Sequence, residues 1–213
     1  LGLIAGYGLR SNVEEMYGAL AKSYNEENDR IFLFGFSRGA FTVRVLAGLL
    51  YRCGLPTKNI EDPIKLKKCF EQAYELYKPH ICYSEAYKFN KPNSEELRKI
   101  EQFEENRKNF RQEYHPIKVE IHFLGIWDTV KTYGCIFPQS LPHLRHNPIV
   151  KKVCHALSLN ERRSWFLPTS WGQLDIDEEN LKQAKTDYRY AKQIIKEVWF
   201  QGCHSDIGGG DKE

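Results

Sequence analysis

The chain has 213 residues, with 31 lysines and arginines against 28 acidic residues and a formal net charge of +3. This mild and interleaved charge argues against a nucleic-acid partner, and no apolar run approaches the roughly 18 residues that a membrane span needs. The length fits one domain. We find no secretory signal sequence in these residues and expect a protein that is cytoplasmic or exported without a cleavable signal.

Cysteine usage gives no sign of a metal or redox site. The six cysteines form no C-x-x-C pair and no Cys/His cluster at zinc spacing. We therefore expect reduced, mostly buried thiols, with disulfides as the alternative. The sequence as a whole implies no metal or organic cofactor. The six are Cys53, Cys69, Cys82, Cys135, Cys154 and Cys203.

The first part of the chain predicts helix, strand and helix in succession. Residues 11–28 carry apolar side chains at helical spacing, with Ser11 as the expected N-cap. A short, continuous apolar run over 30–36 is typical of a strand that is buried on both faces of a parallel sheet. Residues 40–54 then predict a mostly buried helix that ends at Gly54.

Residues 56–116 differ in character and predict a helical insertion. Two amphipathic or charged helices, over 63–78 and 94–110, are joined by a tyrosine-rich segment. The aromatic side chains of the insertion either form a lid or acyl-chain groove or pack the helices on the sheet, and the sequence leaves both interpretations open. These side chains are Phe70, Tyr74, Tyr77, Tyr83, Tyr87 and Phe89.

The remaining elements continue the alternation of strand and helix. Residues 117–127 alternate apolar and polar side chains and then become wholly apolar, as a strand entering a core does. Residues 147–159 predict a short helix, and 197–202 predict a last strand. This order indicates the α/β class, with a mostly parallel sheet flanked by helices.

A G-x-S-x-G motif stands between the first predicted strand and the buried helix, which is the context that a nucleophile elbow requires. We expect Ser37 on a strained turn with its Oγ above the sheet edge. We also expect that a Cβ at either Gly35 or Gly39 would collide with the adjacent strand or helix. The backbone N–H of Arg38, at the helix N-terminus, is the expected donor to an oxyanion. A glycine-rich turn with a capping serine is the alternative.

Two further residues have the right type and chain order to serve Ser37. An elbow needs an acid and then a histidine downstream, and Asp128 and His204 each follow a predicted strand, where α/β sheets place functional residues. The alternatives are a capping aspartate and a turn histidine. Asp206 competes with Asp128 as the partner of His204, or supports that histidine, binds a cation or caps the following turn.

The other histidines fit the role of a base less well. His155 falls in the middle of the helix predicted over 147–159, where a packed and hydrogen-bonded side chain is expected. His122 lies inside a predicted strand. The remaining ones lie in polar or proline-rich segments, and they are His80, His115, His143 and His146.

Four segments match, in order and near spacing, the motifs of one family. They are GFSRGAFTVRVLAG, FLGIWDTV, HALSLNERR and CHSDIGGG. With them the sequence resembles the α/β-hydrolase family of formerly unknown function that includes type VI secretion system phospholipase effectors. The resemblance implies an α/β-hydrolase fold with Ser37 as nucleophile, Asp128 as orienting acid and His204 as general base. It also implies hydrolysis of the fatty esters of phospholipids.

The chain departs from the family pattern at both ends. Family members begin with a strand, an Asp-Gly-Thr loop and a second strand, and they continue into a further helix after the segment that matches Gly210. We expect these N-terminal strands and this C-terminal helix to be missing from the 213 residues. The loop is where a second oxyanion donor is expected. A partner protein is expected to cover the sheet edge that the missing strands would expose.

Arg162 and Arg163 offer a further contact for a phospholipid. The guanidinium fork matches the geometry of a phosphate. An ordinary salt bridge to a nearby acid is the alternative, and the sequence does not separate the two.

Together these features predict a single α/β-hydrolase catalytic domain over residues 1–213, with 56–116 as a helical insertion or lid. We expect a serine esterase that works through an acyl-enzyme, with lipid or phospholipid acyl esters as the leading substrates and with contact to a membrane surface. The alternatives are a hydrolase of non-lipid esters or thioesters, and a non-catalytic binding or assembly module on a degenerate hydrolase fold.

Overall fold

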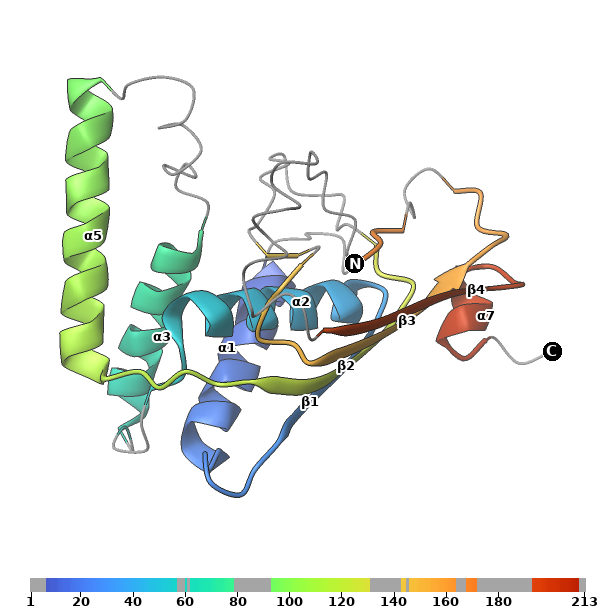
Figure 1. Cartoon of the computed structure of the whole chain (residues 1–213), viewed down its shortest axis with the longest axis horizontal. Coiled ribbons are helices and arrows are strands. Elements are labelled where there is room, and N and C mark those ends of the chain that lie inside the picture. The colour runs from blue at the N-terminus through green and yellow to red at the C-terminus, as the bar shows by residue number, and fades with distance from the viewer. Residues whose placement is uncertain are drawn as a thin grey trace.

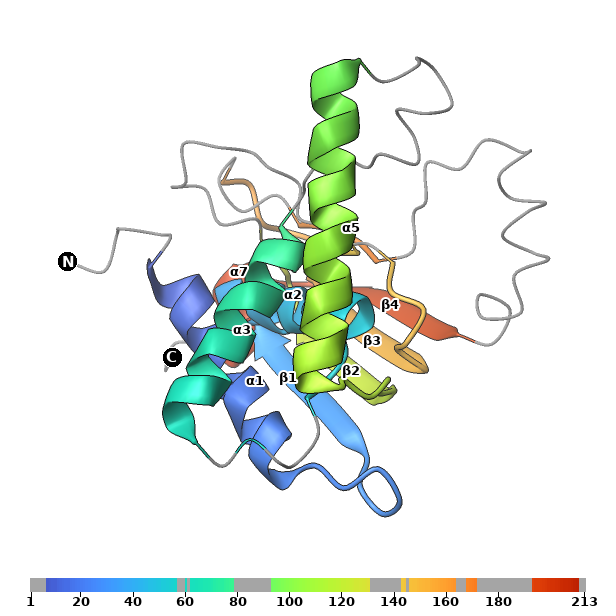
Figure 2. The same ribbon diagram turned by 90° about the vertical axis from the view of Figure 1, so that its left-hand side faces the viewer.

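A computed structural model of the chain contains a four-stranded sheet with helices packed against it (Figures 1 and 2). The structure describes residues 7–56, 60, 62–78, 93–130, 143–144, 146–163, 168–171 and 193–210. The elements in chain order are α1 (Tyr7–Ser23), β1 (Ile31–Phe36), α2 (Arg38–Cys53), α3 (Pro63–Tyr77), α5 (Ser94–Tyr114), β2 (Ile121–Trp127), β3 (Lys152–Ser158), β4 (Ile194–Phe200) and α7 (His204–Gly208).

The sheet follows the order of the chain. Strand β1 pairs with β2, β2 with β3 and β3 with β4, and every pairing is parallel. Parallel pairing brings the carboxyl ends of all four strands to one edge of the sheet. The prediction of an α/β protein with a mostly parallel sheet is confirmed, and this edge is where the residues after each strand meet.

One face of the sheet forms the core together with α1, α2 and α3. Ile31 and Leu33 point from β1 into this core, and the middle of α2 is fully enclosed, with Val45 and Leu46 at 0% exposure. A helix that is apolar on most of its surface must be covered on several sides. Helix α2 achieves this by lying between the sheet and the helices α1 and α3, as Figure 2 shows.

The other face of the sheet carries exposed aromatic side chains. Phe32 and Phe34 alternate with the core residues of β1 and are 50% and 58% exposed. Phe34 lies over Gly125 of β2, where an added Cβ would stand 2.8 Å from the ring. Strands added in one direction keep their right-handed crossovers on one side of a sheet, and α2, which lies between β1 and β2 in the chain, lies on the core side. Helix α2 therefore covers the core side of the sheet and leaves these aromatic side chains of the second face exposed.

Helices α3 and α5 lie within the stretch that the sequence sets apart as an insertion. Phe70, Tyr74 and Tyr77 of α3 are buried in the core, which favours the packing interpretation of these three aromatics. Figure 1 places both helices at the opposite end of the molecule from α7. The two helices therefore do not cover the edge where α7 begins. Tyr83, Tyr87 and Phe89 lie outside the described residues.

Two sequence-based assignments are wrong in their local structure. Residues 152–158 form strand β3 and not a helix, because Val153, His155 and Leu157 alternate onto the buried face while β2 and β4 supply hydrogen bonds on both sides. Helix α1 begins at Tyr7, so Ser11 lies inside it and is not its N-cap. Leu9 packs against the core, which explains why the helix extends back beyond Ser11.

None of the helices within the described ranges is long and apolar enough to cross a membrane.

Adjacent residues of β1 give a matched test of the two faces. Replacing the buried Leu33 by alanine should lower the free energy of unfolding by about 2–5 kcal/mol, because it removes core contacts and leaves a cavity. Replacing the exposed Phe34 by alanine should cost about 1 kcal/mol or less. Urea denaturation of both variants measures the difference. Equal losses would mean that the second face is covered in solution.

Candidate active site

The turn between β1 and α2 holds Ser37 in an uncommon backbone conformation. Ser37 has φ 55° and ψ −119°, a combination that side chains other than glycine rarely adopt. Its N–H donates to the carbonyl of Trp127 at 2.9 Å, which ties the turn to the end of β2. Helix α2 begins at the next residue, so its first N–H groups lie beside the serine.

The two glycines of the motif are not equivalent. A Cβ on Gly35 would lie 2.6 Å from the backbone of Gly39 and Ala40, so only glycine lets β1 approach the start of α2 this closely. A Cβ on Gly39 would meet nothing within 4 Å. The expectation that both positions would clash is therefore correct for Gly35 and wrong for Gly39, which faces open space.

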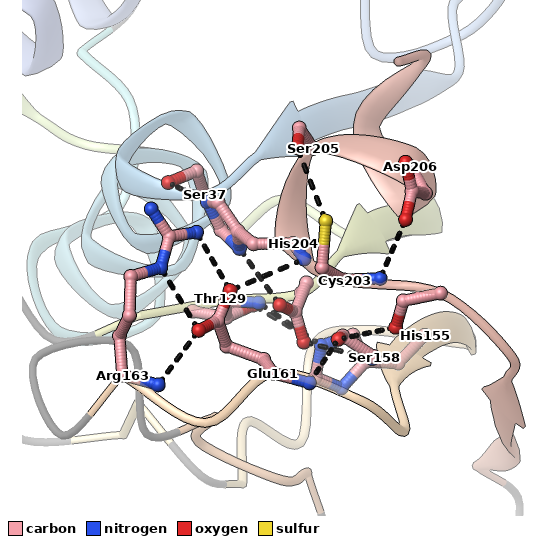
Figure 3. Close-up of polar contacts among 12 residues, drawn as sticks. Ser37, Thr129, His155, Ser158, Glu161, Arg163, Cys203, His204, Ser205 and Asp206 are labelled. Atoms are coloured by element: carbon pink, nitrogen blue, oxygen red, sulfur yellow. Dashed lines mark hydrogen bonds and ion pairs between the residues drawn. The ribbon is translucent and has the colours of Figure 1, made fainter. Parts of the chain in front are cut away.

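His204, the first residue of α7, reaches the serine directly. Its Nε2 lies 2.7 Å from Ser37 Oγ, although the two residues are 167 positions apart (Figure 3). The His204 side chain is largely buried, and its ring packs on that of Phe36 with 4.7 Å between the centroids. This stacking and the hydrogen bond fix the ring over the turn.

Asp128 occupies the other side of the same ring. Its Oδ2 lies 2.7 Å from His204 Nδ1, and its Oδ1 accepts the N–H of Ser158 at 3.0 Å. The side chain has no exposure, and the backbone is left-handed, with φ 38°. Because Nδ1–H donates to Asp128, Nε2 is left to accept the hydroxyl of Ser37. The structure thus brings together the three side chains predicted to act together.

Asp206 has a different position from Asp128. Its Oδ2 accepts the N–H of Cys203 at 2.6 Å and closes a capping box at the start of α7. The hydrogen bonds from Cys203 lower the pKa of the Asp206 carboxyl. Of the uses that the sequence leaves open, the structure supports capping of the turn.

Residues at the end of β3 and just after it, which were not predicted from the sequence, hold the loop of His204. Ser158 Oγ donates to the carbonyl of Gly202 at 3.0 Å, and the N–H of Gly202 donates to Asn160 Oδ1 at 2.8 Å. Glu161 Oε2 accepts the backbone N–H of His204 at 3.3 Å. These residues belong to the HALSLNERR segment. Polar residues at the end of a strand are candidates for a site, but the predicted helix over 147–159 hid this position.

Glu161 also forms a bidentate ion pair with Arg163. Arg163 donates from Nε at 2.9 Å and from Nη2 at 2.6 Å to the two carboxylate oxygens. This pairing lowers the pKa of Glu161 to about 2. For Arg163 the structure supports the salt bridge, which leaves Glu161 ionised to accept the N–H of His204. Arg162 is exposed.

Among the described residues, no group of three or more His, Cys, Asp or Glu side chains is placed to hold a metal ion. Cys53, Cys69, Cys154 and Cys203 are free thiols, and burial raises the pKa of Cys53 and of Cys69 to about 12. Cys82 and Cys135 lie outside the described part of the chain.

Comparison with known proteins identifies the family. A family model described as the catalytic domain of Tle1-like phospholipase effectors of the type VI secretion system (T6SS) matches residues 1–213. The chain belongs to this family. The family expected from the sequence motifs is confirmed, and it is one of phospholipase-like hydrolases.

Two individual proteins add to this comparison. Over 160 residues the chain is 35% identical to the uncharacterized protein YEL023C of Saccharomyces cerevisiae, an alignment that covers 75% of this chain and 21% of that protein. A solved structure of the Tle1 effector bound to the VgrG spike from the Type 6 secretion system matches with a TM-score of 0.41 and 17% identity. That match covers 96% of this chain and 31% of the solved chain. The chain thus spans less than a third of the length of each.

The difference in the space available for a side chain at Gly35 and at Gly39 can be tested by mutation. Gly35→Ala should destabilise the protein by about 1–3 kcal/mol, because the backbone of α2 must move away from the new Cβ. Gly39→Ala should be neutral or stabilising by a few tenths of a kcal/mol, because alanine favours helix and space is open. Thermal unfolding of the two variants tests this. A Gly39→Ala variant as unstable as Gly35→Ala would contradict the geometry.

Proposed function

We propose that the chain is the catalytic part of a serine hydrolase with an α/β-hydrolase fold, which cleaves carboxylic esters. The observation that carries the proposal is the continuous set of contacts from Ser37 through His204 to Asp128, with 2.7 Å at each step. Membership in a family of phospholipase effectors supports the same reaction class. Residue types, order and distances meet the requirements of nucleophile, base and orienting acid.

In the proposed reaction Ser37 Oγ attacks the ester carbonyl while His204 Nε2 takes its proton. His204 then gives this proton to the leaving alcohol, and an acyl-enzyme forms on the serine. Water, deprotonated by the same nitrogen, releases the acid and restores the serine. Asp128 holds the ring with Nδ1–H toward itself and stabilises the imidazolium that forms in each half of the reaction.

The start of α2 supplies the proposed stabilisation of the oxyanion. The backbone N–H of Arg38 follows the nucleophile directly, at the positive end of a 16-residue helix. The Arg38 side chain is exposed, so the main chain carries this role. We propose that the second donor comes from an Asp-Gly-Thr loop of the kind the family motif contains.

Lipid or phospholipid acyl esters are the substrate class that we propose. The family description supports it, and so do the apolar side chains exposed near the candidate site, where Phe36 is 37%, Trp127 36% and Leu159 62% exposed. Contact with a membrane surface at this edge would bring acyl chains to Ser37. Among the described residues, only β2 pairs with β1. We further propose that another protein segment covers the other edge of β1, because unpaired backbone groups at a strand edge favour further pairing.

A fluorophosphonate probe tests the nucleophile. The protein expressed from its full coding sequence should be labelled at Ser37, and Ser37→Ala should abolish labelling. Asp128→Asn should lower ester hydrolysis by about 10⁴-fold, because the ring of His204 then adopts the wrong tautomer. Mass spectrometry locates the label, and circular dichroism verifies that both variants are folded.

Two outcomes would count against this function. Equal labelling of wild type and Ser37→Ala would place the reactive group elsewhere. Absence of labelling in a folded wild-type protein would favour a binding or assembly module on a degenerate hydrolase fold.

Acyl-chain length separates lipid from non-lipid substrates. If the acyl chain is buried, each added CH₂ contributes about 0.8 kcal/mol, so two added methylenes should raise kcat/KM about tenfold. Rates measured with p-nitrophenyl esters from acetyl to octanoyl test this. A flat or falling series would contradict the lipid assignment and favour small esters or thioesters.

A further inference from the structure

A second histidine–carboxylate pair lies behind Asp128, inside the core. His155 of β3 has a fully buried side chain, and its Nδ1 lies 2.7 Å from Glu197 Oε1 of β4. Its Nε2 lies 3.3 Å from both the backbone N and the Oγ1 of Thr129, the residue that follows Asp128. Figure 3 labels His155 and Thr129 in the same close-up as Ser37 and His204.

The partners of His155 define its tautomer. A backbone N–H can only donate, so the Nε2 that faces Thr129 must be the unprotonated nitrogen. Nδ1 then carries the proton and donates it to Glu197. Protonation of Nε2 would turn the acceptor into a donor and break the bond to the N–H of Thr129.

Charged groups of both signs surround His155. Arg44 of α2 places Nη2 3.4 Å from His155 Nδ1, while Glu197 and Asp128 are the acids that face it from β4 and from the end of β2. Burial lowers the pKa of His155, and the Arg44 charge acts in the same direction against the raising effect of the acids. The ring therefore stays neutral near pH 7 and keeps its acceptor for Thr129.

The bond to Thr129 acts on the peptide that leaves the proposed acid. Asp128 has φ 38°, a conformation that needs support from its surroundings. Thr129 supplies that support on two sides, since its N–H donates to His155 and its carbonyl accepts the N–H of Thr169 at 2.8 Å. A small rotation of this peptide would move the Asp128 carboxylate away from His204.

We propose that His155 is a positioning residue, which holds the Asp128–Thr129 turn through its unprotonated Nε2 and so keeps Asp128 on His204. The predicted effect of His155 on the rate of hydrolysis rests on the proposed hydrolase function. Its structural part does not depend on activity. A misplacement of about 1 Å in a reacting group can cost about 10²-fold in rate, which sets the size of the expected effect.

Two substitutions of His155 separate its two nitrogens. The amide of glutamine can reach the place of Nε2, so His155→Gln keeps an acceptor for the N–H of Thr129. The amide of asparagine reaches only the place of Nδ1, so His155→Asn keeps the donor to Glu197 and loses the acceptor. His143→Asn is the control, since His143 is a partly buried histidine that packs on Tyr51, near the opposite end of α2 from Ser37.

The rate of fluorophosphonate labelling and kcat for a p-nitrophenyl ester are measured for folded protein of each variant. We expect His155→Asn to lower both about 10²-fold with little change in KM, His155→Gln to stay within about tenfold of wild type, and His143→Asn to match wild type. Equal losses in the Asn and Gln variants, or none in either, would overturn the proposal, because packing alone would then explain His155.

Nuclear magnetic resonance gives a readout that does not need activity. In wild type, ¹⁵N shifts should show His155 protonated at Nδ1 alone at pH 7, and the Nδ1 proton of His204 should give a hydrogen-bonded signal. That signal should persist in His155→Gln and be lost or shifted in His155→Asn. Protonation of His155 at Nε2 would overturn the inference even if the Asn variant does not fold. If wild type shows the expected His155 tautomer but is not labelled by the probe, the hydrolase function is refuted and the structural role of His155 stands.

Discussion

A buried carboxylate is the constraint on which the carboxyl edge of the sheet depends. Asp128 has no exposure, and an unpaired charge in such a place would cost several kcal/mol. Its two oxygens accept hydrogen bonds from the backbone N–H of the last residue of β3 and from a ring nitrogen at the start of α7. Meeting this requirement fixes the ends of β2 and β3 and the position of α7 relative to one another, before any substrate is considered.

The turn after β3 extends this constraint to the backbone of the last loop. Ser158 and Asn160 bond to both the carbonyl and the N–H of Gly202, and Glu161 receives the N–H of His204. A loop held at several backbone points has few alternative positions, so in the proposed reaction the ring of His204 is already in place before substrate binds. Polar groups that are already oriented need not reorganise at the moment of reaction. This preorganisation is the main source of electrostatic catalysis.

The sequence was sufficient to predict which three side chains lie together, because residue type and chain order leave few possibilities. A serine between glycines after a buried strand, followed by an acid and a histidine at later strand ends, led to Ser37, Asp128 and His204. It was insufficient for residues 152–158, where a short apolar run suits helix and strand alike and pairing with β2 and β4 decides. The bonds of Ser158 and Asn160 to Gly202 span 44 and 42 positions, a distance that no local pattern encodes.

The agreement between strand order and chain order has a consequence for biosynthesis. Among the described strands, each pairs with the edge of the one made before it, so this part of the sheet can grow as the ribosome extends the chain. Ser37 follows β1 and Asp128 follows β2, but His204 arrives only beyond β4. A nascent chain would therefore carry the serine on a partly formed sheet without its partner histidine, and the three side chains would meet only when β4 had docked.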